Sequence, residues 1–456
     1  MLKPFQLLWF MPLFLLSCSE QSQVSSDDWQ ALFNGKNLKG WQRLNGNAKY
    51  SVEDETIVGQ TKRNTPNTFL ATNKNYGDFQ LEFEVLVDPY INSGVQIRSN
   101  SYSDYQDGRV HGYQIEIDPS ERGWSAGIYD EARRGWLYPL GLNPRAGEAF
   151  KAGDWNKIYV EAIGRQIKTW INDVPASFLL DDLTDEGFIA LQVHSIDKPE
   201  LVGRLIKWRN IRIKTGNLIP RESEFPFVVN NIPNDLSSEE KEQGWISLFD
   251  GSSLQHWRGA HKEDFPNEGW EVKDRELTVV ESGGDEARHG GDIVTKDEFG
   301  SFEFQLEFKL TQGANSGIKY FVTEEYDAGE GSAIGLEYQL LDDAQHPDAS
   351  NGRDGNRTLG SLYDMIPAQK QDRFVNAPGS WNHARIIVYP NNHVEHWINH
   401  VKVLEFERGS RAFLDLVQIS KYKVWEDFGL ADQGHILLQD HGNQVSFRSI
   451  KVRNLQ

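Results

Sequence analysis

The chain repeats itself, and this repeat constrains its fold more than any other feature. The segment WQALFNGKNLKGWQ at 29–42 matches WISLFDGSSLQHWR at 245–258. Three further blocks follow in the same order: NSGVQI recurs as NSGIKY, a WN…WIN block recurs once, and GFIALQVHS recurs as GHILLQDHG. Each unit spans roughly 200 residues, far more than the 20 to 50 residues of a solenoid repeat. We therefore expect a tandem duplication of one whole domain.

The matched blocks have the pattern of β-strands. In FEFQLEFKL, at 302–310, apolar and polar residues alternate, as they do on a strand with one buried face. Convincing helical stretches are absent, and Gly and Asn mark the turns. The pattern predicts an all-β protein of two tandem jelly-roll sandwiches, the first over 29–215 and the second over 244–456.

A linker is expected between the two units, at 216–243. Pro220, Pro226 and Pro233 disfavour a helix or a central strand there. Ser237 and Glu240 have the spacing of a capping box. The linker should therefore end in a short helix.

The N-terminus has the features of an export signal. Residues 1–18 hold a lysine, a short apolar run and then the only cysteine of the chain, Cys18. The run is too short to span a membrane. It resembles a bacterial lipobox, which implies cleavage before Cys18 and lipidation of that residue. Residues 19–28 read as a polar tether. We expect a lipid-anchored protein of a Gram-negative cell envelope, on the periplasmic face or the cell surface, touching membrane only through its anchor.

The formal net charge of −20 argues against a nucleic-acid partner. Phosphate backbones are bound by clustered Lys and Arg, and this chain carries an excess of carboxylates.

Both halves resemble the 3-keto-disaccharide hydrolase domain family. The resemblance rests on LFNGKNLKGW, NSGVQIRS, GYQIEIDP and WSAGIYDEARRGWL in the first half, and on LFDGSSLQHW, NSGIKYFV, GLEYQLLDDAQHPDA and VEHWINHVKVLEFE in the second. It implies a concanavalin A-like jelly roll that acts on oxidised glycosides or oligosaccharides. It implies that no organic cofactor is needed, while a bound divalent cation stays possible. It also fits a sugar 3-dehydrogenase that acts upstream and supplies the oxidised substrate.

The chemistry that this resemblance implies is an elimination. A ketone at C3 of a sugar acidifies the C2 proton and makes the C1 substituent a β-leaving group. A base removes the proton, a cation or Lys/Arg polarises the carbonyl, and an acid protonates the leaving oxygen. Addition of water would then complete a net hydrolysis.

The second half supplies the candidate catalytic residues. Glu337 and Gln339 lie two apart on a predicted strand, so they share one face. Asp342, Asp343 and His346 follow in a loop, where they could act in catalysis or hold a metal ion. Lys319 is the candidate carbonyl polariser. Gln339 is also a candidate for substrate binding, and the remaining matched blocks supply the other candidates, Tyr363, Asp364, His396, Asp440 and His441.

The first half carries a different set at the matched positions. Gln114 and Glu116 stand where the second half has Glu337 and Gln339, so amide and carboxylate have exchanged places. This second candidate site, a binding module or an active site of other specificity, comprises Gln96, Gln114, Glu116, Asp118, Arg133 and Arg134.

Two other functions stay open at this point. The E-x-D-x-x-E run that contains Glu116 and Glu121 is similar to the signature of family-16 retaining glucanases, although Pro119 breaks the strand alternation between them. The protein could also be a non-catalytic carbohydrate-binding lipoprotein.

Overall fold

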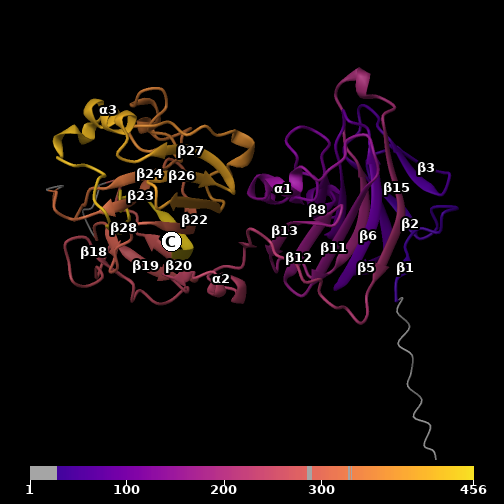
Figure 1. Cartoon of the computed structure of the whole chain (residues 1–456), viewed down its shortest axis with the longest axis horizontal. Helices are drawn as coiled ribbons and strands as arrows, with labels where there is room; N and C mark the ends of the chain where they lie inside the picture. The colour runs from indigo at the N-terminus through magenta and orange to yellow at the C-terminus, as the bar shows by residue number, and fades with distance from the viewer. Residues whose placement is uncertain (1–27, 285–289, 327–328, 330, 456) are drawn as a thin grey trace, which may run out of the picture.

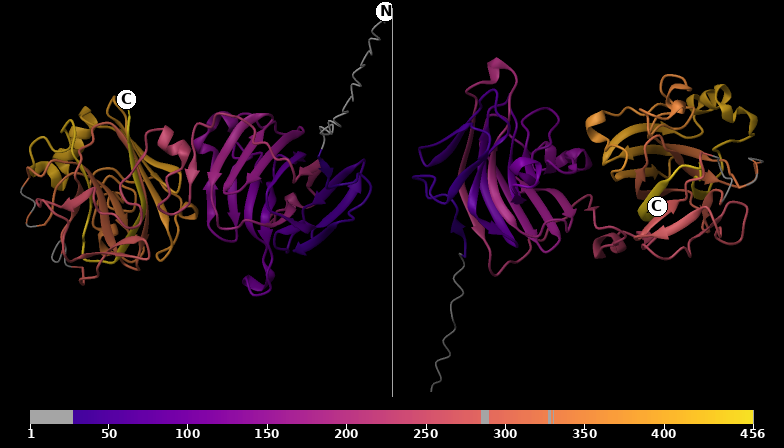
Figure 2. Two further views of the ribbon diagram at one scale, coloured as in Figure 1. Left: turned by 90° about the horizontal axis from the view of Figure 1, so that it is seen from below. Right: turned by 180° about the vertical axis from the view of Figure 1, so that it is seen from behind.

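A computed structural model of the chain describes residues 28–284, 290–326, 329 and 331–455. The predicted signal segment and Cys18 lie outside the described residues. Two β-rich domains stand side by side along the longest axis of the molecule (Figures 1 and 2). Among the described helices, none is long and apolar enough to cross a membrane.

The first domain is a sandwich of two sheets. The nine-stranded sheet contains β1 (Gln30–Ala31), β3 (Lys49–Glu53), β4 (Thr56–Gln60), β6 (Phe79–Val87), β11 (Asn156–Ile163), β12 (Gln166–Ile171), β13 (Val174–Leu180), β15 (Leu205–Lys214) and β16 (Val229–Asn230). The seven-stranded sheet contains β2 (Trp41–Asn45), β5 (Thr68–Tyr76), β7 (Ser93–Asn100), β8 (His111–Ile117), β9 (Ile128–Glu131), β10 (Gly135–Tyr138) and β14 (Gly187–Val193).

The second domain repeats this plan with fewer strands. The eight-stranded sheet contains β17 (Ile246–Ser247), β19 (Trp270–Lys273), β20 (Glu276–Val279), β22 (Phe302–Leu310), β25 (Asn382–Val388), β26 (His393–Ile398), β27 (Val401–Glu407) and β29 (Val445–Asn454). The five-stranded sheet contains β18 (Trp257–Gly259), β21 (Ile293–Thr295), β23 (Asn315–Val322), β24 (Leu336–Leu341) and β28 (His435–Leu438).

Helices are short and lie in the connections. The α-helices are α1 (Pro144–Gly147), α2 (Ser238–Glu242) and α3 (Arg411–Ile419). Single 3₁₀ turns are η1 (Gln106–Gly108), η2 (Leu140–Leu142), η3 (Pro199–Leu201), η4 (Pro347–Ser350), η5 (Asp372–Phe374) and η6 (Lys421–Val424).

Strand alternation builds both cores, because successive side chains of a strand point to opposite faces of the sheet. On β22, Phe302, Phe304, Leu306 and Phe308 all enter the core of the second domain. On β23, Ile318 and Tyr320 do the same, and on β24 Leu336, Tyr338 and Leu340 do so. The prediction of an all-β chain with two tandem jelly-roll sandwiches and a Pro-containing linker is confirmed.

The linker contacts both domains. Its strand β16 pairs in parallel with β13 of the first domain. Its helix α2 begins with a capping box, in which Ser237 Oγ accepts from the Glu240 N–H and Glu240 accepts from the Ser237 N–H. Glu240 also accepts from Asn230 at 2.7 Å and forms an ion pair with Lys451 on β29 of the second domain.

The two domains also touch directly. The Trp124 ring of the first domain lies 5.6 Å from the Phe374 ring of the second, and the Arg385 guanidinium of the second domain lies 4.5 Å above the Phe227 ring of the linker. Phe374, from the second domain, belongs to the apolar core of the first. The domain interface is therefore a packed one.

Candidate functional site

Glu337 lies on β24 with its side chain on the face turned away from the main core. Its strand neighbour across the ladder is Lys319 on β23, and Gln339 lies opposite Gly317. The exposed fraction of Glu337 is only 4%, because loops fold over this face. The paired strands fix the backbone of Glu337, and a catalytic side chain on such a rigid element is held in a defined position.

Gly317 makes room for this carboxylate. A Cβ atom on Gly317 would stand 2.7 Å from Glu337 Oε1 and 3.2 Å from Gln439 Oε1. Real Cβ atoms do not come so close, so any side chain here would displace Glu337. The glycine of the repeated NSG motif thus serves a close side-chain approach rather than a turn.

Two tyrosines accompany Glu337. The Tyr422 hydroxyl donates to Glu337 Oε2 at 3.2 Å, and the Tyr363 N–H donates to the Glu337 backbone oxygen at 2.9 Å. Burial, followed by the charge of Glu337, raises the pKa of Tyr422 well above its ordinary value. Burial and the hydrogen bond to Asp348 raise the pKa of Tyr363. Both phenols therefore keep their protons at neutral pH and can donate them.

Tyr363 lies within a charged network at the edge of this group. Its hydroxyl donates to Asp348 at 2.7 Å, and Arg357 bridges Asp348 and Asp364 with contacts of 3.0 Å. Asp364 also accepts from the backbone N–H of Lys421 at 2.7 Å, which ties η6 and its Tyr422 to the site. Asp364 therefore positions the loop that carries Tyr422.

Gln339 contributes a buried acceptor. Its amide nitrogen donates to Asn315 Oδ1 at 3.1 Å, while its buried Oε1 has no hydrogen-bond partner among the described residues. Buried polar atoms are nearly always satisfied, so this unpaired oxygen is an exception within the described part of the structure.

Lys319 and Asp440 bind loops together. Lys319 Nζ lies 3.3 Å from Asp292 Oδ2 and 3.0 Å from the Ala333 oxygen. Asp292 Oδ1 accepts from the Asp440 N–H, and the Asp440 carboxylate accepts from the N–H groups of Gly291 and Gly442. Through these contacts, Lys319 and Asp440 hold neighbouring segments of the protein together.

The loop after β24 does not gather Asp342, Asp343 and His346 into a metal site. Asp342 accepts from the Gly313 N–H at 2.8 Å, and Asp343 forms an ion pair with Lys370 at 3.0 Å. Within the described ranges, the group whose ligand atoms lie within 4.8 Å of one another is instead His393, Glu395 and Glu405.

His346 lies at the rim with His441. The two rings are perpendicular and 6.2 Å apart, and His346 Nδ1 accepts from the Asp348 N–H. Burial, together with the neighbouring His441, lowers the pKa of His346. The neutral imidazole is therefore favoured at this rim.

His396 lies in the core and not in the site. It is fully buried, and its ring nitrogens contact the Tyr320 hydroxyl at 2.9 Å and the Gly360 oxygen at 3.0 Å. Burial lowers its pKa to about 4. Strand alternation on β26 turns this side chain inward, so the structure does not support the predicted role in substrate binding.

In the first domain, the matched face carries a hydrogen-bonded row of side chains. Gln96 donates to Gln114 at 2.6 Å, and Gln114 donates to Glu116 Oε2 at 3.0 Å. Burial raises the pKa of Glu116 to about 7. Gly94 lies opposite Glu116, as Gly317 lies opposite Gln339, so the exchange of amide and carboxylate is preserved in three dimensions.

Asp118 is linked to this row by Arg122, which lies 3.7 Å from Glu116, whereas Arg133 and Arg134 lie apart from it. Asp118 forms an ion pair with Arg122 at 2.7 Å, and Glu121 is exposed beyond that turn. Arg133 and Arg134 both bind Asp130 and line a cavity between the two domains. The structure therefore does not unite the six residues into one site.

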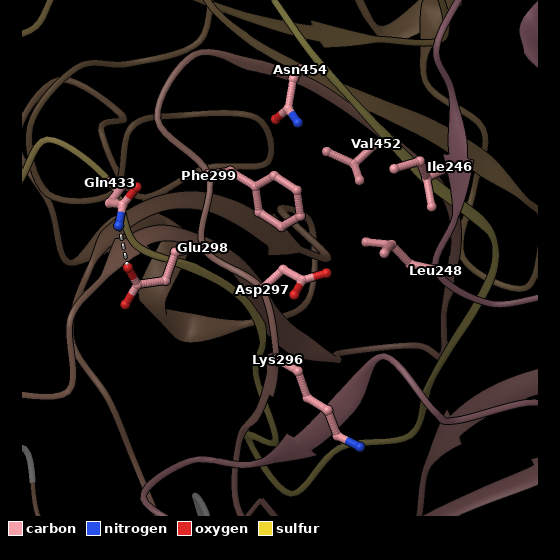
Figure 3. Close-up of a pocket in the computed structure, with 9 residues that line it drawn as sticks. All are labelled: Ile246, Leu248, Lys296, Asp297, Glu298, Phe299, Gln433, Val452 and Asn454. Carbon is pink, nitrogen blue, oxygen red and sulfur yellow. Dashed lines mark hydrogen bonds between the residues drawn. The ribbon is translucent and has the colours of Figure 1, made fainter.

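Two cavities elsewhere escaped the sequence prediction. One of 600 Å³ in the first domain is lined by Glu131, His194 and Arg109, and burial raises the pKa of Glu131. Another of 500 Å³ lies beside β17 and β29 of the second domain, where Gln433 donates to Glu298 at 2.9 Å (Figure 3). The second cavity holds none of the predicted site residues.

Tyr422 is the principal site residue that the sequence did not reveal. It lies in η6, between the matched blocks, and has no counterpart in the repeat. Its contact with Glu337 spans 85 residues. No local pattern signals such a contact.

Comparison with known proteins identifies relatives of both domains. A family model described as the 3-keto-alpha-glucoside-1,2-lyase-like domain matches residues 28–214 and 244–453. A 3-keto-disaccharide hydrolase from Bacteroides thetaiotaomicron is 38% identical over 46% of this chain and 79% of its own length.

Two solved structures of Parabacteroides distasonis proteins assigned to the glycosyl hydrolases are also similar. One is 30% identical over 49% of this chain and 100% of its own, with a TM-score of 0.42. The other is 28% identical over 44% and 99%, with a TM-score of 0.32. Since the two regions matched by the family model make up most of the sequence, this chain belongs to the family of 3-keto-alpha-glucoside-1,2-lyase-like domains, which it carries twice.

Proposed function

We propose that this protein is a carbohydrate-active enzyme that cleaves 3-keto-glycosides, and that the second domain carries the reaction. The observation that supports this most is the strand-borne, buried Glu337, flanked by two protonated phenols and given space by Gly317. The name of the Bacteroides thetaiotaomicron relative points to the same substrate class.

Glu337 acts as the general base in this proposal. The C3 ketone acidifies the C2 hydrogen, and Glu337 takes that proton while the C1–O bond breaks and a C1–C2 double bond forms. Tyr422 holds the carboxylate through its hydroxyl. A positioned general base typically contributes about 10² to 10⁴ in rate.

The partly buried Tyr363 is the assigned acid. Its pKa is raised, so it holds a proton that it can give to the leaving oxygen, and Asp348 and Arg357 fix its orientation. Water then adds across the double bond if the reaction proceeds to net hydrolysis. Asp342, Asp343 and His346 are each engaged with other groups of the protein, so they have no role in these steps.

The test compares a 3-keto-disaccharide with the unoxidised disaccharide. We expect the protein to cleave the keto form alone. In deuterated water, NMR of the products should show exchange or loss of the C2 hydrogen. Equal rates on both sugars would contradict the elimination. Complete retention of the C2 hydrogen would indicate direct hydrolysis instead.

The retaining-glucanase alternative is less well supported. Retaining glycosidases hold two carboxyl groups about 5 Å apart. Glu116 is buried on β8, whereas Glu121 is exposed after the turn that Asp118 and Arg122 close. A sugar-binding role without catalysis predicts binding of keto and unoxidised sugars with no products.

We also propose that the protein is exported and anchored by lipid at Cys18. The lipobox-like segment before Cys18 supports this. Labelled palmitate should enter the wild-type protein in cells and not the Cys18→Ala variant. Equal labelling of the two proteins would refute the anchor.

A further inference from the structure

A cavity of 600 Å³ opens on the first domain, between the loop that precedes β8 and the ends of β9 and β14. Glu131, the last residue of β9, and His194, directly after β14, line it together with Arg109 from the loop. Glu337 and its partners belong to the second domain. The cavity is therefore separate from the candidate active site.

Glu131 presents a carboxylate oxygen to this cavity, although the residue is only 6% exposed. Its contacts go to Oε1, where Asn67 Nδ2 donates at 3.4 Å and Arg109 Nη2 lies at 3.6 Å. Oε2 has no hydrogen-bond partner among the described residues, yet it retains accessible surface, unlike the enclosed side-chain atoms of Gln192. Burial raises the pKa of Glu131, so placing a carboxyl group here has a cost. A buried carboxylate with one oxygen open to a cavity indicates a place for donors from a ligand.

His194 and Arg109 add polar groups of opposite kinds. His194 Nδ1 lies 2.6 Å from the Ser195 oxygen, which can only accept, so Nδ1 carries the hydrogen. In the neutral ring, Nε2 then presents a lone pair, and within the described ranges it has no hydrogen-bond partner. The Arg109 side chain is 53% exposed and supplies donors at the mouth of the cavity.

The loop that carries Arg109 is held in place by the protein itself. Its residues Gln106–Gly108 all have positive φ, which costs energy for residues other than glycine. Asn45 Nδ2 and Ser101 Oγ both donate to the Gly108 oxygen, at 2.9 and 2.6 Å, and so fix this turn. A ligand therefore loses little free energy in ordering this wall of the cavity.

The buried carboxylate is specific to the first domain. The segment YDE at 129–131 matches YDM at 363–365, and each of them pairs with the strand that carries the matched carboxylate and amide. Met365 thus takes the place of Glu131, and it is buried in the apolar core of the second domain. Packing alone accepts an apolar residue at this position, so the carboxylate points to a separate role.

One wall of the cavity is apolar. Phe69 on β5 lies opposite Gln192 and lines the cavity. In the second domain, the register of β21 and β28 puts Asp292 at the matching place, where it forms an ion pair with Lys319. The first domain has Phe69 and Gln96 instead of this pair. An apolar wall beside a few placed polar groups is typical of small-molecule sites.

The charges around the cavity restrict its occupant. Glu131 and Asp107 disfavour phosphate and carboxylate ligands, and Arg109 disfavours a cationic ligand. Hydroxyl groups suit both polarities, because they can donate to Glu131 and His194 and accept from Arg109. A sugar carries several hydroxyl groups on a compact ring whose faces are partly apolar.

We propose that this cavity of the first domain binds a neutral saccharide. Adjacent hydroxyl groups donate to Glu131 Oε2 and His194 Nε2, and Arg109 donates to a further sugar oxygen. The proposal goes beyond the keto-glycoside chemistry, because no group of that mechanism lines the cavity.

The test is calorimetric titration of the purified protein with maltose, sucrose and trehalose in turn, and with sodium phosphate. At least one disaccharide should bind, and phosphate should not displace it. Glu131→Gln keeps the shape of the side chain but removes its charge, and Arg109→Met removes the exposed donor. Each variant should weaken binding by about tenfold or more, the effect of losing a hydrogen bond to a charged group.

Glu186→Gln is the matched control, because it removes an exposed carboxylate of the same domain that does not line this cavity. Its affinity should equal that of wild type. Binding of none of the three sugars, wild-type affinity in both cavity variants, or displacement of sugar by phosphate would each overturn the proposal. Melting curves check the folding of the variants, and Arg109→Met, at an exposed position, keeps the test decisive if Glu131→Gln does not fold. Failure of keto-sugar cleavage would leave these titrations unaffected, so the two proposals fail separately.

Discussion

The carboxylate of Glu337 occupies the space that a side chain on Gly317 would fill. A Cβ atom on Gly317 would lie 2.7 Å from Glu337 Oε1. In the first domain, a Cβ on Gly94 would lie 2.3 Å from the Gln114 side chain. The same glycine of the repeat thus admits a carboxylate in one domain and an amide in the other.

Gly317→Ala should therefore impair catalysis more than folding. The added methyl group pushes the flexible end of Glu337 aside, at a stability cost of about 1 kcal/mol, while the misplaced base loses about tenfold or more in kcat/KM. Steady-state kinetics and a melting curve measure the two effects. Gly94→Ala is the control, and it should leave kcat/KM near wild type. Equal losses in both variants would show that the domains act together.

Glu337→Gln should abolish most of the turnover. Gln keeps the shape and can still accept from Tyr422, so the melting temperature should change little, while the loss of a general base lowers kcat by about 10² to 10⁴. Glu116→Gln is closely matched, because Glu116 is 3% exposed on the corresponding strand of the first domain. If Glu337→Gln kept a near-normal rate while Glu116→Gln lost activity, the first domain would carry the reaction.

Tyr422→Phe removes the hydroxyl that donates to Glu337 at 3.2 Å. We expect kcat/KM to fall by about fivefold to tenfold, since one such bond is worth about 1 kcal/mol. Tyr138→Phe also removes one buried hydroxyl, which donates to the Phe227 oxygen at 3.1 Å. The kinetics of that control should match wild type. Identical kinetics for Tyr422→Phe and wild type would remove Tyr422 from the site.

The features that could be predicted from the sequence are those encoded by strand alternation and by the internal repeat. The alternation of β22 predicted which of its side chains enter the apolar core, and the repeat predicted two domains of one fold. The spacing of Glu337 and Gln339 correctly predicted that they share a sheet face. These properties depend on neighbours within a few residues or on comparison of the two halves.

Contacts between distant segments were not predictable in the same way. His396 looked like a site residue, but the register of β26 turns it into the core. Lys319 looked like a free polariser, but Asp292, 27 residues earlier, is its ion-pair partner. The partnership of Glu337 with Tyr422 depends on where η6 folds back over the sheet. Such pairings follow from tertiary packing and leave no local pattern.

The last prediction concerns pH and the buried Glu116. Burial raises its pKa from 4.5 to about 7, against the opposing effect of Arg122, which lies 3.7 Å away. The folded state therefore binds the proton more tightly than the unfolded state. The resulting stabilisation is full below pH 4.5 and is lost as the pH rises through about 7. The difference of about 2.5 pKa units corresponds to roughly 3 kcal/mol.

Glu116→Gln should remove this dependence, because Gln does not ionise and can still accept from Gln114. Urea unfolding of both proteins at about pH 5 and pH 8 measures it. The free energy of unfolding of the variant, relative to wild type, should rise by up to roughly 3 kcal/mol between the two pH values. Other titrating groups are common to both proteins and cancel in this comparison. A constant difference at both pH values would mean that Arg122 keeps Glu116 ionised throughout, in contradiction to the dominance of burial.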